Sequence, residues 1–109
     1  MLRANVVDRR ISRQIPFRLP QGTVGETVSL NMDEDWNGLD KIMLVWSNTG
    51  TGASVETELT GTESMVPAEI LSQPGNLYLS VVGYVFGDDG ELERRITTAK
   101  MPTPWVVDA

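Results

Sequence analysis

Short stretches in which apolar and polar residues alternate recur along the chain, and each predicts a β-strand with one buried face. The clearest example spans residues 27–32, where Val, Leu and Met alternate with Thr, Ser and Asn. Residues 11–19 and 54–59 follow the same period of two. Pro16 marks the first of these two stretches as an edge strand, because proline cannot donate a hydrogen bond to a second neighbour.

Longer apolar stretches predict the central strands of the fold. Residues 41–46 (KIMLVW) are apolar on both faces, which is typical of a central strand or of one packed against a neighbouring subunit. Residues 77–86 form the longest expected strand. The sequence Asp-Asp-Gly at 88–90 predicts a hairpin that returns through residues 92–100, and a last short strand follows at 105–107.

Turn-forming residues separate these stretches, and helical periodicity nowhere exceeds one turn. Pro67 predicts a single helical turn within residues 65–71, a tight turn follows at 73–75, and Gly83 predicts a bulge in the longest strand. The pattern therefore predicts an all-β fold. We expect a single antiparallel β-sandwich, immunoglobulin-like or jelly-roll, with about seven or eight short strands.

Composition limits the chemistry that this single domain can perform. The 109 residues include no Cys and no His, so disulfides, thiolate nucleophiles, imidazole catalysis and His/Cys metal sites are excluded. Residues 77–86 are about half as long as the ~20 residues needed to cross a bilayer. We expect no enzymatic activity, no cofactor and no membrane partner.

Charge is distributed unevenly along the chain, whose formal net charge is −6. Residues 1–20 carry five arginines and one aspartate, a net of +4, whereas residues 21–93 carry thirteen acids and only Lys41, a net of −12. We therefore divide the domain into a basic N-terminal arm and edge strand, residues 1–20, and a sandwich body, residues 21–109. An acidic body repels phosphate backbones, so no nucleic-acid partner is expected.

The candidate partner-binding residues are the arginines of the basic segment: Arg3, Arg9, Arg10, Arg13 and Arg18. They either form ordinary ion pairs with the acidic body or dock onto an acidic neighbouring subunit.

Two acidic motifs partly match known sites, one for calcium binding and one for acid/base catalysis, but each lacks a feature that its site requires. Residues 33–38 match the first half of a calcium loop, but Leu44 occupies the position of the closing glutamate, so a turn carrying Trp36 is favoured over a metal site. Glu56 and Glu58 project from one strand face, but nothing in the sequence separates their environments as acid/base catalysis requires.

Four stretches taken together resemble the small β-sandwich domain of tailed-phage virion accessory proteins. They are DEDWNGLDKIMLVWSN, VPAEIL, QPGNLYLSVVGY and RRITTAKMPTP, which cover about two thirds of the chain in the expected order. The matching positions are Trp36, Val66, Pro67, Glu69, Pro74, Gly75, Gly83, Arg95, Ile96 and Thr98. The resemblance implies structural roles for these residues, and no catalytic residue is carried over from it.

The resemblance implies a capsid decoration, head-fibre or baseplate/tail attachment role. Because the sequence stops at Ala109 with no distal domain, we expect a capsid decoration or a head/tail surface subunit that stabilises the particle. Its partners would be major capsid or tail proteins and further copies of itself, in a virion assembled in the host cytoplasm. The alternative is a carbohydrate-binding attachment module, which needs at least one of Trp36, Trp46 and Trp105 flat on the surface.

Overall fold

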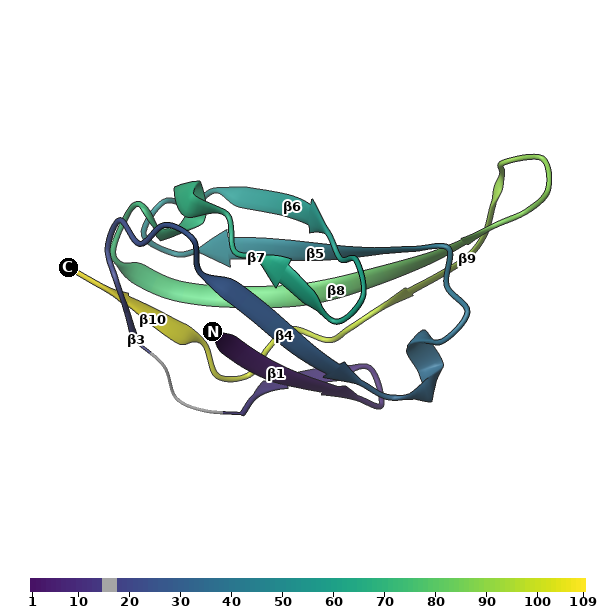
Figure 1. The fold of residues 1–109 in the computed structure, drawn as a ribbon, viewed down its shortest axis with the longest axis horizontal. Helices are drawn as coiled ribbons and strands as arrows, with labels where there is room; N and C mark the ends of the chain where they lie inside the picture. The colour runs from purple at the N-terminus through teal and green to yellow at the C-terminus, as the bar shows by residue number, and fades with distance from the viewer. Residues whose placement is uncertain (15–17) are drawn as a thin grey trace.

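The computed structural model describes residues 1–14 and 18–109. Within these ranges the chain forms ten strands and two single-turn 3-10 helices (Figure 1). The elements are β1 (Leu2–Val7), β2 (Arg10–Arg13), β3 (Arg18–Pro20), β4 (Thr27–Met32), η1 (Glu34–Trp36), β5 (Lys41–Asn48), β6 (Ser54–Glu58), β7 (Glu63–Met65), η2 (Ala68–Leu71), β8 (Gly75–Phe86), β9 (Leu92–Thr97) and β10 (Trp105–Asp108). In the described residues, no helix has the length and apolarity needed to span a membrane.

The strands form two sheets that pack face to face as a β-sandwich. One sheet has the order β2-β1-β4-β7, and the other has the order β3-β10-β8-β5-β6, with β9 paired to the distal part of β8. The predicted all-β sandwich is therefore confirmed. Six of the eight strand pairings are antiparallel, and β1 with β4 and β10 with β3 are parallel. The strand number exceeds the expected seven or eight because β1 and β7 were not predicted and because the expected strand over residues 11–19 is divided into β2 and β3.

The core between the sheets is built from the inward side of each alternating strand. The side chains of Leu44, Trp46, Leu79 and Trp105 are essentially excluded from solvent. The rings of Trp46 and Trp105 lie 6.4 Å apart between centroids, at an interplanar angle of 34°. The expected central position of residues 41–46 is correct, since β5 lies between β8 and β6, although the opposite face of β5 is only half-buried.

The first part of the basic N-terminal segment belongs to the sandwich itself. Strand β1 is an inner strand, pairing antiparallel with β2 on one side and parallel with β4 on the other. Leu2, Ala4 and Val6 are buried in the core. The sequence pattern did not predict this inner strand, because only alternate residues of β1 face the core and its charged residue, Arg3, faces outward.

The expected strand over residues 11–19 is divided between two sheets. Strand β2 is an edge of the first sheet and β3 is an edge of the second, so both described parts have the predicted edge position. The proline assigned to that edge, Pro16, lies outside the described residues.

Buried Asn48 ties the end of β5 to two loops. Its Nδ2 donates to the carbonyl oxygens of Ile70 and Gln73, both at 2.9 Å, and its Oδ1 accepts from the N–H of Gly50 at 2.8 Å. A Cβ on Gly75 would stand 2.2 Å from Asn48 Oδ1, so only glycine permits this close approach. These contacts fix η2 and the Gln-Pro-Gly turn against the central strand.

A second cluster closes the opposite end of the sandwich. A Cβ on Gly83 would meet Trp36 at 3.2 Å, Ile96 at 3.3 Å and a Leu39 methyl at 2.4 Å. Gly83 therefore serves close packing of the Trp36 turn on β8. The predicted bulge at Gly83 is corrected, since the register shift between β8 and β9 lies between Val85 and Phe86.

Candidate interaction surface

The five candidate arginines divide into two that are engaged within the chain and three that face solvent. Arg18 on β3 forms a salt bridge to Asp108, with Nη1 2.9 Å from Oδ1. Arg13 on β2 donates from Nη1 to the carbonyl oxygen of Pro104 at 2.9 Å. The exposed residues Arg3, Arg9 and Arg10 form no salt bridge to the described parts of the chain. The first pair therefore fits the structural interpretation, and the last three are the candidates for partner binding.

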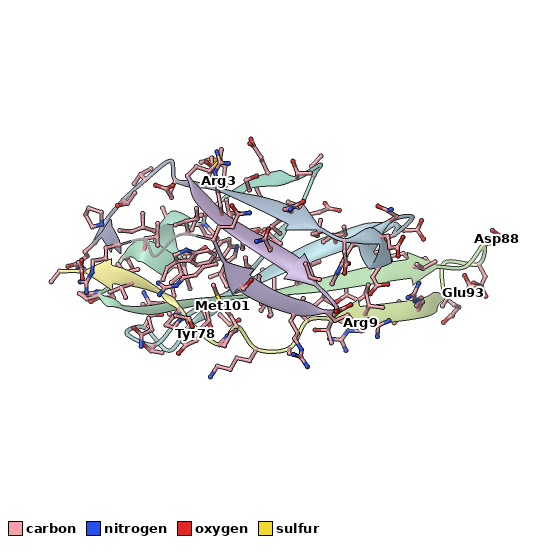
Figure 2. The ribbon with its side chains drawn as sticks, turned by 90° about the horizontal axis from the view of Figure 1, so that it is seen from below. Arg3, Arg9, Tyr78, Asp88, Glu93 and Met101 are labelled. Atoms are coloured by element: carbon pink, nitrogen blue, oxygen red, sulfur yellow. The ribbon has the colours of Figure 1, made fainter. Side chains whose placement is uncertain are left out.

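Arg9 lies on a turn whose backbone is constrained. Asp8 and Arg9, between β1 and β2, have φ values of 53° and 59°, the left-handed geometry of a type I′ hairpin turn. Asp33 Oδ2 accepts from the N–H of Asp8 at 2.8 Å, and the N–H of Ala99 donates to the carbonyl oxygen of Arg9 at 2.8 Å. Two segments distant in sequence thus hold the turn, so Arg9 is presented from a fixed backbone (Figure 2). Arg10 follows it as the first residue of β2.

The outer face of the first sheet is polar. Asn5 Oδ1 on β1 accepts hydrogen bonds from Gln14 Nε2 at 2.8 Å and from Asn31 Nδ2 at 3.3 Å. Arg3 lies two residues before Asn5 on the same face, beside Ser29 of β4. This part of the face is therefore a hydrogen-bonded polar surface that carries Arg3, and Arg10, the partner of Val7, lies further along the same face.

A groove beside Arg10 combines apolar walls with positive charge. It runs between the β1–β2 hairpin and the segment after β9, has a volume of about 440 Å³ and is lined by Val7, Arg10, Ile11, Ser12, Ala99, Lys100 and Pro102. Val7 is 54% exposed there and contributes apolar surface to the groove. We call this feature the basic groove.

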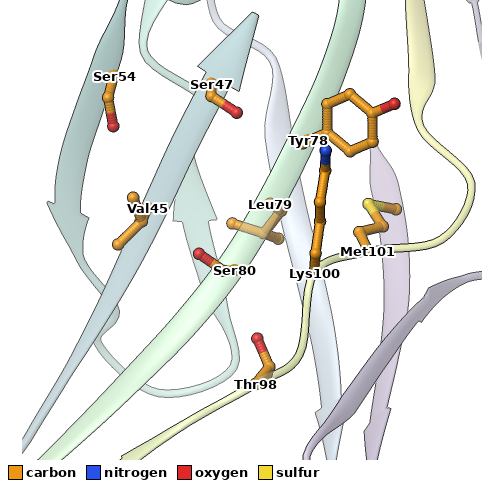
Figure 3. A pocket seen from close by; sticks show the side chains of 9 residues that line it. All are labelled: Val45, Ser47, Ser54, Tyr78, Leu79, Ser80, Thr98, Lys100 and Met101. Carbon is orange, nitrogen blue, oxygen red and sulfur yellow. The ribbon is translucent and has the colours of Figure 1, made fainter.

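A second pocket lies on the outer face of the other sheet (Figure 3). Here β8 pairs with β10 through Leu77 and with β9 from Val82 onward, so residues 78–80 pair with β5 alone. Serine and threonine side chains, Val45, Tyr78 and Lys100 line a volume of about 320 Å³. The Lys100 ammonium lies 4.8 Å from the Tyr78 ring centroid and so covers its face.

The hairpin between β8 and β9 projects from the end of the molecule (Figures 1 and 2). Phe86 and Leu92 are partners across it and are 41% and 51% exposed. The Phe86 ring stacks on Tyr84 at 6.0 Å and 11°. Hydrogen bonds within the turn, from the N–H of Gly87 to the carbonyl of Glu91 and from the N–H of Gly90 to the carbonyl of Gly87, close its tip. The segment from Phe86 to Glu93 also carries four acids: Asp88, Asp89, Glu91 and Glu93. We call residues 86–93 the acidic hairpin.

The other candidate groups have structural surroundings. All three tryptophans are buried, at 4% exposure or less, so they form no surface platform. Asp33 of the calcium-like motif accepts a hydrogen bond from the N–H of Asp8 through Oδ2. The described residues contain no group of three or more His, Cys, Asp or Glu side chains placed to hold a metal. Glu56 and Glu58 lie exposed on β6 beside Val45 and Met43.

The sequence indicates the arginines as candidate partner-binding residues, but it does not indicate the exposed apolar residues. Val7, Phe86 and Leu92 look like ordinary strand residues in the sequence, and their exposure depends on which neighbours cover each sheet face. The symmetric placement of Phe86 and Leu92 around the Asp-Asp-Gly turn is the one signal that pairs them.

Comparison of the chain with protein-family models, curated proteins and solved structures finds no match. A functional assignment therefore depends on the sequence motifs and on the surfaces just described.

Proposed function

We propose that the chain is a non-enzymatic structural protein of a bacteriophage virion, a capsid decoration or a head/tail surface subunit that binds and stabilises the particle. It assembles in the host cytoplasm, in multiple copies, on major capsid or tail proteins. It uses no cofactor and contacts neither nucleic acid nor membrane.

The observation that carries this proposal is the convergence of the four stretches that resemble phage accessory domains. Asn48 of the first stretch bonds to Ile70 of the second and to Gln73 of the third. Gly83 of the third stretch packs between Trp36 of the first and Ile96 of the fourth. The four stretches therefore contact one another in the folded chain, and three of the matching positions, Trp36, Gly83 and Ile96, pack together.

The attachment surface in this proposal comprises Arg3, Arg9 and Arg10. They are exposed, and the backbone of β1, β2 and their turn is fixed by pairing and by Asp33. Because the backbone is already fixed, no backbone entropy is lost when these cations form charge-assisted contacts with carboxylates of a neighbouring subunit. Charge-assisted contacts of this kind weaken as salt is raised.

The alternative, a carbohydrate-binding attachment module, has less support. Its tryptophan platform is buried, and a sugar in the Tyr78 pocket would meet an aromatic ring that Lys100 already covers. Binding of the isolated chain to a glycan array, abolished by Tyr78→Ala, would favour this alternative.

The test is reconstitution on particles of the phage that encodes the chain, prepared without it. We expect purified chain to bind such particles at regular sites visible by cryo-electron microscopy, and Arg3→Glu with Arg9→Glu to reduce occupancy about tenfold or more at low salt. Glu56→Lys with Glu58→Lys, on the opposite face, is the matched control and should bind normally. Absence of the chain from purified wild-type virions by mass spectrometry would contradict the proposal.

A further inference from the structure

We propose that copies of this chain associate head to tail, with the acidic hairpin of one copy docked in the basic groove of the next. The occupant of the groove is thus a second copy of the chain. This inference stands independently of the virion role, since it depends only on two surfaces of the protein itself.

The acidic hairpin has the features of an inserting element. It projects from the body, its tip is closed by internal hydrogen bonds, and it exposes Phe86 and Leu92 as an adjacent apolar pair. Stacking on Tyr84 restricts the Phe86 ring. An exposed aromatic with few accessible rotamers is typical of an interface anchor, because little entropy is lost when it is buried.

The basic groove has the complementary features. Val7, Ala99 and Pro102 offer apolar surface, Arg10 lies on its wall, and Arg9 lies beside Ala99 through their backbone hydrogen bond. The Lys100 stem also lines it, while the Lys100 ammonium lies over Tyr78. The groove therefore pairs apolar walls with the exposed guanidinium group of Arg10, and the hairpin pairs two apolar side chains with four carboxylates.

The fold prevents the acidic hairpin from binding in the basic groove of the same molecule. Strand β9 leads from Leu92 at the hairpin toward Ala99 at the groove, and its six residues extend over about 20 Å. Since β9 is paired to β8, the hairpin cannot bend back onto the groove of the same molecule. A hairpin and a groove at different places on one chain make a heterologous contact, which produces rings or open chains rather than a closed two-fold dimer.

Sedimentation velocity of the purified chain over a range of concentrations tests the proposal. We expect the wild-type mass to rise with concentration and to fall at high salt. Arg10→Glu in the groove, and Phe86→Ser with Leu92→Ser in the hairpin, should each weaken association about tenfold or more. The matched control is Val24→Ser with Met65→Ser, which removes two exposed apolar side chains elsewhere and should associate like wild type.

Mixing the two defective variants gives the decisive result. The groove variant keeps an intact hairpin and the hairpin variant keeps an intact groove, so the mixture should form one-to-one dimers and nothing larger. Unchanged circular dichroism and melting temperatures establish that both variants are folded. A wild-type chain that stays monomeric at millimolar concentration in low salt, or a mixture that stays monomeric, would overturn the proposal.

Discussion

Asp33 Oδ2 accepts a 2.8 Å hydrogen bond from the backbone N–H of Asp8, which lies 25 residues earlier in the chain. The contact joins the loop after β4 to the hairpin turn after β1, and it satisfies a donor in a turn whose two central residues both have positive φ. One carboxylate therefore determines how the turn that carries Arg9 is presented.

We expect Asp33→Ala to lower the free energy of unfolding by about 1 to 2 kcal/mol, because a charge-assisted hydrogen bond is lost at a partly buried site. Urea denaturation followed by tryptophan fluorescence measures the change. Asp35→Ala, an exposed acid two residues along without a side-chain bond in the described structure, is the control and should change stability by less than about 0.5 kcal/mol. Equal effects of the two substitutions would contradict the assigned role.

Arg9→Gly should stabilise the fold by about 0.5 to 1 kcal/mol. Arginine at a φ of 59° carries the left-handed penalty, which glycine avoids, and this gain exceeds the extra entropy that glycine loses on folding. Arg10→Gly is the comparison, because the neighbouring residue lies in β2, and there we expect a loss of similar size. Thermal melting of both variants distinguishes them, and a loss of stability in Arg9→Gly would show that the turn is formed differently.

Asn48→Ala should lower stability by about 2 to 4 kcal/mol. The substitution leaves the carbonyls of Ile70 and Gln73 and the N–H of Gly50 without their side-chain partner at a position that is 1% exposed. Asn76→Ala on β8 is the matched control, since the Asn76 side chain is exposed. Chemical denaturation should therefore show a large effect for Asn48 and almost none for Asn76.

Gly83→Ala should cost about 1 to 3 kcal/mol, since the added methyl overlaps a Leu39 methyl and presses on the Trp36 and Ile96 side chains. Combining it with Leu39→Ala removes the closest contact, so the two losses should be less than additive. A double-mutant cycle measures the coupling. Fully additive losses would mean that Leu39 does not pack on Gly83.

The local sequence pattern was sufficient to predict the strands that have one buried and one exposed face. Strand β4 spans residues 27–32 as predicted, and the β8–β9 hairpin turns at Asp-Asp-Gly, with Gly90 at a φ of 81°. These features depend on side-chain alternation and on backbone preferences, both of which are properties of a few consecutive residues.

Only the tertiary structure decided which strands are neighbours and what their outer faces meet. Strand β1 is an inner strand because β4, whose paired residues lie 26 positions later in the chain, pairs with it in parallel, a contact that no local pattern specifies. Long-range packing also brings Arg18 into a salt bridge with Asp108 and lets Arg13 donate a hydrogen bond to the carbonyl oxygen of Pro104. Val7, Phe86 and Leu92 stay exposed because no element covers them, so exposure, unlike strand formation, depends on the arrangement of the whole chain.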